Sequence, residues 1–146
     1  MIEVQVEHLG AVQFEIKARQ HTIVSDQPAE NSGHDEGMTP PELMLASLGS
    51  CAAFYAAAYL RKFKLAAEGT KVRVTADKKK DPARLDDFRI AIEIPAGLDP
   101  KHLAGVERAV HQCLIHNTLL NPPTIAIEIH ARALAEAEAV DLGVGI

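Results

Sequence analysis

Two cysteines, Cys51 and Cys113, are the only cysteines among the 146 residues of this chain, and their side chains could carry redox chemistry. Each lies in an apolar stretch whose pattern predicts a helix. If those helices pack side by side, the chain holds a buried dithiol. A disulfide between them would require Cα atoms about 4.4 to 6.8 Å apart. In the alternative interpretation, each cysteine is simply a small buried apolar side chain.

Composition and charge narrow the classes of function. A chain with 47% apolar residues is expected to fold as one domain over residues 1–146. Its 15 basic and 20 acidic residues give a formal charge of -5, and no basic stripe appears that would bind nucleic acid or an anionic membrane. The N-terminus lacks the pattern of a secretory signal, so we expect a cytoplasmic location, where paired cysteines are more often redox-active or metal-binding than structural.

Alternating apolar residues predict strands in both halves of the chain. The predicted strands cover residues 2–7, 12–17, 22–24, 72–76, 88–94 and 125–129. A polar segment from Asp26 to Met38 is expected to be a long loop. The run Lys78-Lys79-Lys80-Asp81-Pro82 is interpreted as a solvated hairpin turn. The alanine-rich tail from Ala131 fits either the end of a strand or a loose helix.

A long helix is predicted to start at Thr39. The sequence Thr39-Pro40-Pro41-Glu42 combines a capping threonine, a proline at the first helical position and a glutamate that can reach back to the cap. From Leu43 to Leu60 the helix carries no charge and has small residues on every side, so we expect it to be covered on all faces. Its length just reaches that of a membrane span, but alanine, serine and glycine favour a second subunit as the cover.

A second helix is expected after Asp99-Pro100. Its apolar stripe consists of Leu103, Val106, Val110 and Cys113. This spacing places Cys113 on the buried face of a continuous helix. The order of the elements, with hairpins at both ends and no regular alternation of strand and helix, predicts an α+β fold.

Metal binding is the rival chemistry for the two cysteines. In a continuous helix, His111 lies about 200° from Cys113, whereas His116 shares its face. With Cys51 this makes three ligands at best, so no metal site is predicted. No glycine-rich phosphate loop appears, and no cofactor is expected. His116 is instead expected to line the pocket around the thiols or to cap the end of the helix.

Two segments resemble the OsmC/Ohr family, named for osmotically induced and organic hydroperoxide resistance proteins. They are Thr39-Pro40-Pro41-Glu42-Leu43-Met44-Leu45-Ala46-Ser47-Leu48-Gly49-Ser50-Cys51 and Cys113-Leu114-Ile115-His116-Asn117-Thr118-Leu119. In that family a central helix begins after a proline-containing turn and carries the first cysteine a little over two turns in. The resemblance implies an OsmC-like fold with antiparallel sheets and two long central helices. It also implies an intertwined homodimer with two active sites at the interface.

Members of the family reduce organic hydroperoxides, and a dithiol reductant then restores their paired cysteines. The resemblance implies that Cys51 attacks the peroxide, becomes a sulfenic acid and is resolved by Cys113 as a disulfide. A cysteine in apolar surroundings is a poor nucleophile unless a cation stabilises its thiolate. The resemblance assigns this part to Arg19, between the second and third strands. The cations Arg61 and Lys62 lie at the far end of the helix that carries Cys51.

The chain departs from the family pattern at two positions. Pro41 occupies the place of the glutamate that holds the arginine in the peroxidase branch, and Leu114 replaces a common proline. Glu42 follows the family position by one residue, which turns its side chain by about 100° around the helix axis. It is therefore either the helix cap or the partner of Arg19. Asp35 and Glu36 are other candidate partners. These departures keep open a second function, a non-catalytic dimer that binds an apolar small molecule in the interface pocket.

Overall fold

The computed structural model describes residues 1–95 and 97–131. Its strands are β1 Gln5–Gly10, β2 Gln13–Ala18, β3 His21–Ser25, β4 Lys71–Lys80 and β5 Ala83–Glu93. Its helices are α1 Pro40–Lys62, α2 Pro100–Val110, α3 Leu114–Leu120 and the 3₁₀ turn η1 Ala29–Asn31. One antiparallel sheet has the order β1-β2-β3 and a second pairs β4 with β5, which confirms the predicted α+β fold.

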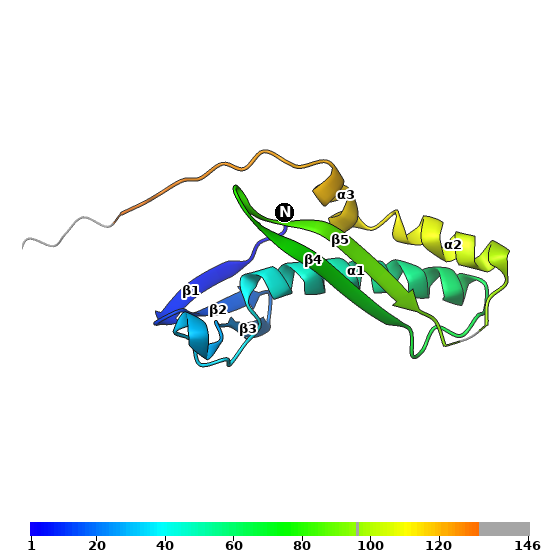
Figure 1. The fold of residues 1–146 in the computed structure, drawn as a ribbon, viewed down its shortest axis with the longest axis horizontal. Helices are drawn as coiled ribbons and strands as arrows, with labels where there is room; N and C mark the ends of the chain where they lie inside the picture. The colour runs from blue at the N-terminus through cyan, green and yellow to red at the C-terminus, as the bar shows by residue number, and fades with distance from the viewer. Residues whose placement is uncertain (96, 132–146) are drawn as a thin grey trace, which may run out of the picture.

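The arrangement in space is elongated (Figure 1). The sheet β1-β2-β3 lies near the N-terminal end of α1, whereas β4 and β5 cross the same helix further along. The helix α2 packs beside the second half of α1. With 23 residues, α1 is the one long helix in the described part of the chain, since α2 has 11. Two long central helices would therefore require a second copy.

The start of α1 is fixed by its predicted cap. The carboxylate of Glu42 accepts hydrogen bonds from the backbone N–H and the hydroxyl of Thr39, both at 2.8 Å. The backbone bond from Thr39 is the main cause that holds the pKa of Glu42 below its usual value. The prediction that Glu42 caps this helix is confirmed.

The predicted loop before α1 is organised by one buried carboxylate. Asp26 is 1% exposed and accepts hydrogen bonds from the backbone N–H groups of Gln27, His34 and Glu36 at 2.7, 3.1 and 3.2 Å. Burial acts to raise the pKa of Asp26, but these hydrogen bonds outweigh it and hold the pKa below its usual value. A single charged side chain thus connects both ends of the loop that leads into α1.

The core of the chain follows one stripe of α1. Ala52, Ala56 and Leu60 are fully shielded and belong to the same cluster as Val106 and Val110 of α2. Other faces of α1 remain accessible. Length and composition alone would allow α1 to cross a membrane, and only 22% of that window, with mean hydropathy 1.6, is buried. One chain therefore does not supply the cover that the sequence predicts for this helix.

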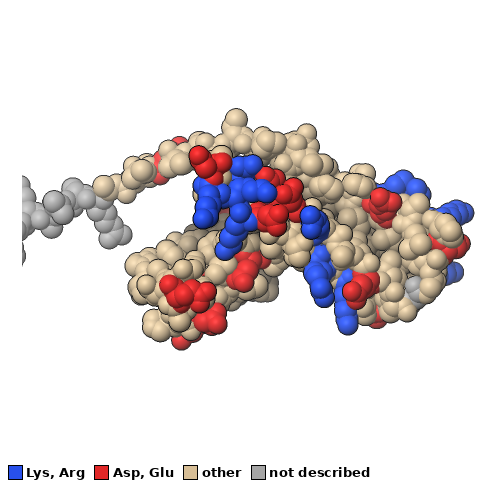
Figure 2. Space-filling view, viewed as in Figure 1, with Lys and Arg blue, Asp and Glu red and all other residues tan. Residues whose placement is uncertain are grey.

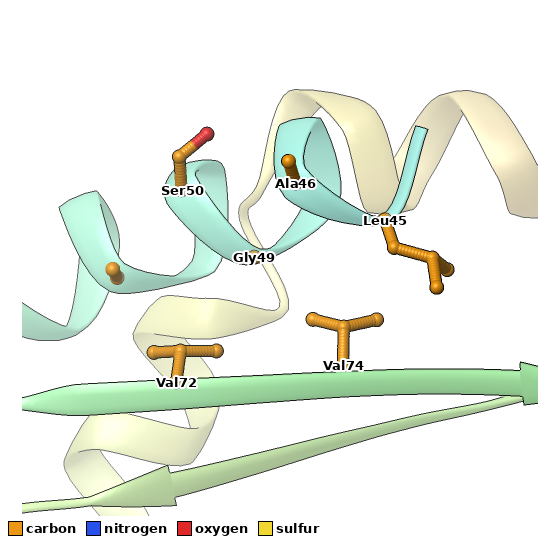
Figure 3. Close-up of a pocket in the computed structure, with 7 residues that line it drawn as sticks. Leu45, Ala46, Gly49, Ser50, Val72 and Val74 are labelled. Carbon is orange, nitrogen blue, oxygen red and sulfur yellow. The ribbon is translucent and has the colours of Figure 1, made fainter. Parts of the chain in front are cut away.

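Small residues allow α1 to approach the second sheet closely. In Figure 3 Gly49 faces the strand that carries Val72 and Val74. A Cβ atom at Gly49 would lie 3.1 Å from Cγ2 of Val74, a tight contact. The groove between them has a volume of about 320 Å³ and is lined by Leu45, Ala46, Gly49, Ser50, Ala53, Val72 and Val74.

The β4–β5 hairpin carries charges of both signs. Figure 2 shows basic and acidic side chains next to each other over this part of the molecule. Lys79 contacts Asp87 at 3.1 Å, and Arg84 contacts Asp86 at 2.8 Å. The lysine run predicted as a turn forms the end of β4, and the turn follows it. Of the three lysines, Lys79 is paired with a carboxylate, and acidic side chains of β5 lie beside the run.

The second predicted helix ends earlier than expected. It stops at Val110, and Cys113 lies beyond it as the N-cap of α3, where its Sγ accepts the backbone N–H of His116 at 3.4 Å. The prediction of a continuous helix through Cys113 is wrong because the thiol caps a new helix. Burial follows the predicted stripe at Val106, Val110 and Cys113, whereas Leu103 is 53% exposed.

The predicted last strand is not formed within one chain. Residues 122–131 run as an extended arm, defined here as that range, and pair with no strand of the described residues. Figure 1 shows the arm leaving the body of the molecule after α3. Its side chains Ile125, Ile127 and Ile129 are 83, 83 and 88% exposed. A strand needs a neighbouring strand and a surface for its apolar side, and one chain offers the arm neither. The predicted tail beyond Ala131 lies outside the described residues.

Because α2 packs tightly against α1, adding one methyl group at Gly105 of α2 is expected to destabilise the fold. A Cβ atom at Gly105 would lie 1.9 Å from the hydroxyl oxygen of Tyr59 and 2.6 Å from a ring carbon. We expect Gly105→Ala to lower the free energy of unfolding by about 1 to 3 kcal/mol, because the whole ring must move. Urea denaturation followed by circular dichroism measures this. Gly97→Ala is the matched control, since nothing lies within 4 Å of a Cβ there; equal effects of the two substitutions would contradict the prediction.

Candidate functional site

The structure brings the two cysteines together. Cys51 is half-buried on α1, and Cys113 is fully buried at the start of α3, which packs against α1. Their side chains are close enough for Cys51 to act on the titration of Cys113 by hydrogen bonding. Both are free thiols. The predicted dithiol between two packed helical segments is therefore present. Cys113, however, lies at the start of a helix and not in its interior.

The surroundings of Cys113 favour its neutral thiol. Burial is the main cause that raises its pKa, and the hydrogen bond with Cys51 raises it further. The backbone N–H groups of His116 and Ile115 act in the opposite direction without reversing the shift. No cation of the described residues contributes to it. Cys113 thus needs a route for losing its proton before its sulfur can act as a nucleophile.

Arg19 lies away from the thiols in the single chain. It occupies the turn between β2 and β3, in a surface groove lined also by Met1, Glu3, Gln5 and Lys17. That sheet contacts the rest of the described chain only weakly. One copy of the chain therefore does not place the expected cation at Cys51.

Two of the three candidate carboxylates have other partners in the single chain. Glu42 is bonded to Thr39 as the cap of α1. Glu36 accepts a hydrogen bond from the side chain of Gln13 at 2.7 Å. Asp35 lies in the same loop with a left-handed backbone, at φ +58°. None of the three forms an ion pair with Arg19 among the residues that the structure describes.

Two histidines meet beside the thiols, which the sequence analysis did not foresee. His111 is the C-cap of α2 and keeps a helical backbone, but the chain leaves the helical path at Cys113, and the ring centroids of His111 and His116 come within 5.3 Å. The sequence analysis assumed a continuous helix, in which His111 and Cys113 lie on different faces. Leu114 and Ile115 continue the apolar character directly after Cys113, so the sequence gives no clear signal of this break. No group of three or more metal-ligating side chains forms within residues 1–95 and 97–131.

Two cavities flank β5 next to the thiol pair. The α2–β5 cavity, about 340 Å³, is lined mainly by Ile90, Ile92, Ile94, Val106, Val110 and His116. The α3–β5 cavity, about 870 Å³, is lined mainly by Met44, Leu48, Phe88, Ile90, His116 and Leu119. His116 and Ile90 belong to both walls. Glu107 and His111 also line the first cavity, and Arg84, Asp86 and Asp87 the second, whereas neither cysteine lines them. The site thus combines a dithiol with nearby, largely apolar space that polar side chains border.

This arrangement can perform a limited chemistry within one chain. Neighbouring thiols can pass between a dithiol and a disulfide when an oxidant reaches the more accessible one, Cys51. The apolar cavities would receive the carbon skeleton of a small molecule better than a charged group. A thiolate-stabilising cation is the part that the described chain does not bring to Cys51.

Comparison with solved structures agrees with the fold of this chain. A structure from Psychrobacter arcticus 273-4, described as an osmotic stress induced and detoxification response protein, has 26% identity and a TM-score of 0.74, covering 81% of this chain and 88% of the other. An OsmC-like protein from Mycoplasma pneumoniae has 16% identity and a TM-score of 0.73, covering 84% and 89%. An organic hydroperoxide resistance protein OsmC from Legionella pneumophila has 14% identity and a TM-score of 0.58, covering 82% and 88%.

No curated protein matches the chain in sequence. The family model for OsmC-like proteins, however, matches residues 33–128, which include the end of the loop before α1, α1 itself, both cysteines and most of the arm. This match covers well over half of the chain. The protein therefore belongs to the OsmC-like family.

Proposed function

We propose that this protein is a thiol-dependent peroxidase that reduces organic hydroperoxides. The observation that carries the proposal is the contact between the half-buried Cys51 and the fully buried Cys113. Related folds include proteins named for organic hydroperoxide resistance. The two apolar cavities beside the thiols suit the carbon skeleton of such a substrate.

The proposed cycle uses each thiol once. The thiolate of Cys51 attacks the peroxide, so that the O–O bond breaks, an alcohol leaves and Cys51 becomes a sulfenic acid. Cys113 then attacks that sulfur, and water leaves as the disulfide forms. A dithiol reductant restores both thiols by exchange. We place this cycle in the cytoplasm, where reducing pools keep such thiols available.

We further propose that two copies form a homodimer. Three features are open to a second copy: the accessible faces of α1, the exposed isoleucines of the arm and the free edges of both sheets. Pairing of two copies would also bring together two α1 helices as the expected pair of long central helices.

Activation of Cys51 depends on this dimer in the proposal. Because Arg19 does not reach Cys51 within one chain, its expected role requires that the second copy supply it. An arginine beside a thiol lowers the pKa of that thiol and increases the thiolate fraction. For Glu42 to be the partner of Arg19, the two copies must make the same contact. Its role as the cap of α1 is fulfilled within one chain.

A second candidate function is non-catalytic binding of an apolar small molecule. The α3–β5 cavity favours it, because its volume of about 870 Å³ is within the usual range of ligand pockets. The sequence departures at Pro41 and Leu114 favour it as well. In this case the two cysteines are buried side chains without redox turnover.

Turnover tests the peroxidase function directly. With cumene hydroperoxide and dithiothreitol, we expect wild-type turnover with transient loss of two thiols per chain, and a decrease of more than about 10³-fold in Cys51→Ser. Without dithiothreitol, which would itself reduce a sulfenic acid, Cys113→Ser should consume one peroxide per chain and keep a sulfenic acid at Cys51. Absence of turnover in the wild type would refute the peroxidase function. A sulfenic acid that persists equally in the wild type and in Cys113→Ser without reductant would refute the resolving role.

Alkylation separates the two candidate functions. A peroxidase requires that iodoacetamide label Cys51 faster than a free cysteine at pH 7, whereas slow native labelling of Cys51 would favour the binding protein. Cys113 should remain protected in both cases. Because its pKa is raised, its thiolate fraction stays below that of a free thiol at each pH and increases only under alkaline conditions. Peptide mass spectrometry before and after unfolding gives both rates.

Complementation tests whether the site is shared between copies. Cys51→Ser and Arg19→Ala are each expected to be inactive, but their co-expression should restore about one quarter of the wild-type sites if Arg19 acts across the interface. The reason is that half of the dimers would be mixed, and each mixed dimer has one intact site. Activity per chain, with the mass from light scattering near twice 15.8 kDa, is the measurement. A monomeric mass, or no restored activity in mixed dimers, would contradict the proposal.

A further inference from the structure

We propose that His116 is the proton-transfer residue of the buried thiol Cys113. This inference rests on the proposed peroxidase function and adds a residue for its second step, the closure of the disulfide. Cys113 is fully buried and its thiol is favoured over its thiolate, so a neighbouring group must accept the proton. His116 carries the titratable side chain that lies in the same helical turn as this thiol, and we assign the proton transfer to it.

The backbone attaches His116 directly to the thiol. Its N–H donates to Sγ of Cys113 at 3.4 Å, because Cys113 is the N-cap of α3 and His116 is the third residue of that helix. The two residues therefore share one end of a short helix. Their relative position does not depend on any mobile surface element.

The imidazole of His116 has one unused nitrogen inside the protein. Nδ1 is shielded from solvent and has no hydrogen-bond partner among the described residues. Buried polar atoms without a partner are rare and unfavourable, so each one calls for an explanation. The same ring lines both the α2–β5 and the α3–β5 cavities. An imidazole with a shielded nitrogen and an edge at a cavity can take a proton on one side and release it on the other.

The charged and titratable groups around this ring come from three elements. The end of α2 contributes Glu107 and His111, and β5 contributes Arg84, Asp86 and Asp87. From α1, Met44 and Leu48 line the shared cavity and carry no charge, and Cys51 contacts the Cys113 thiol. Arg84 is paired with Asp86, and Asp87 with Lys79. Apart from these pairs, Glu107 and His111 are the groups that could share a proton with His116.

The proposed step conserves atoms and electrons. After the peroxide has oxidised Cys51 to a sulfenic acid, His116 accepts the S–H proton of Cys113. The resulting thiolate attacks the sulfur of Cys51, and the S–O bond breaks. The oxygen leaves as water with the proton from His116, so the imidazole ends as it began. The sulfenic sulfur is reduced, and the thiol sulfur of Cys113 is oxidised.

Rapid-mixing experiments on the full chain test this role. Without reductant, one equivalent of cumene hydroperoxide is added, and peroxide loss is measured separately from disulfide formation by acid quench and mass spectrometry. In His116→Asn, we expect peroxide loss within twofold of wild type and disulfide formation slowed by about 10²-fold. Dimedone should then trap the accumulated sulfenic acid. The dependence of disulfide formation on pH between about 5 and 8, where histidines change charge, should flatten.

Controls separate proton transfer from structure. His102→Asn removes a histidine of α2 that lines neither cavity, and should leave disulfide formation within twofold. His116→Phe should slow closure equally while keeping or raising the unfolding temperature, since it removes an unpartnered buried polar atom. In His116→Ala, added imidazole should restore part of the rate. Equal rates in wild type and His116→Asn, or equal slowing in His102→Asn, would overturn the proposal.

A second oxidant distinguishes this inference from the peroxidase function. Diamide oxidises thiols without peroxide, by adding to Cys51 so that Cys113 can displace the adduct and release a hydrazine. If the wild type consumes no peroxide, the peroxidase function fails. Slower disulfide closure with diamide in His116→Asn than in wild type would still support the role of His116. Equal closure rates with diamide would overturn that role independently.

Discussion

The constraint on which this fold depends is the burial of α1. Its interior carries no charge over more than four turns, yet one chain shields only the stripe that includes Ala52, Ala56 and Leu60. Small side chains make this possible, because glycine and alanine let α2 and β4 approach the helix backbone closely. The same small side chains leave the remaining faces of α1 smooth and apolar. The accessible faces of α1 and the exposed isoleucines of the arm are thus apolar surfaces that one chain leaves uncovered.

The contact between the two thiols depends on the end of α2, because the break after this helix sets the position of Cys113. The end of α2 at Val110 lets Cys113 become the cap of α3 while it stays packed against α1. A cap position directs backbone N–H groups at sulfur, but deep burial outweighs them, so the thiol remains protonated. Chemistry at this pair therefore depends on groups that come from outside the dithiol itself. His116 lies beside Cys113 in the sequence of α3, whereas Arg19 of the same chain lies in a separate surface groove.

Local signals in the sequence predicted the elements well, because the interactions that set them are local. The Thr39–Glu42 cap, the Asp99-Pro100 helix start and the alternating strands each depend on residues a few positions apart. The break before Cys113 was missed because apolar periodicity continued through it, and tertiary packing decided the outcome. The strand at 125–129 was predicted from its pattern alone, but strand formation requires a neighbour that this chain does not supply. His111 and His116 meet only because of that helix break.

The turn that carries Arg19 has a further consequence. Ala18 pairs with His21, so Arg19 and Gln20 form a two-residue hairpin loop, and Arg19 has a φ of +56° at its first position. Glycine or asparagine fits such a left-handed conformation best, and a longer side chain there is unfavourable by about 1 kcal/mol. The backbone alone would therefore select against arginine at this site. In the proposed dimer, the contact of the guanidinium group with Cys51 would offset this cost in the turn.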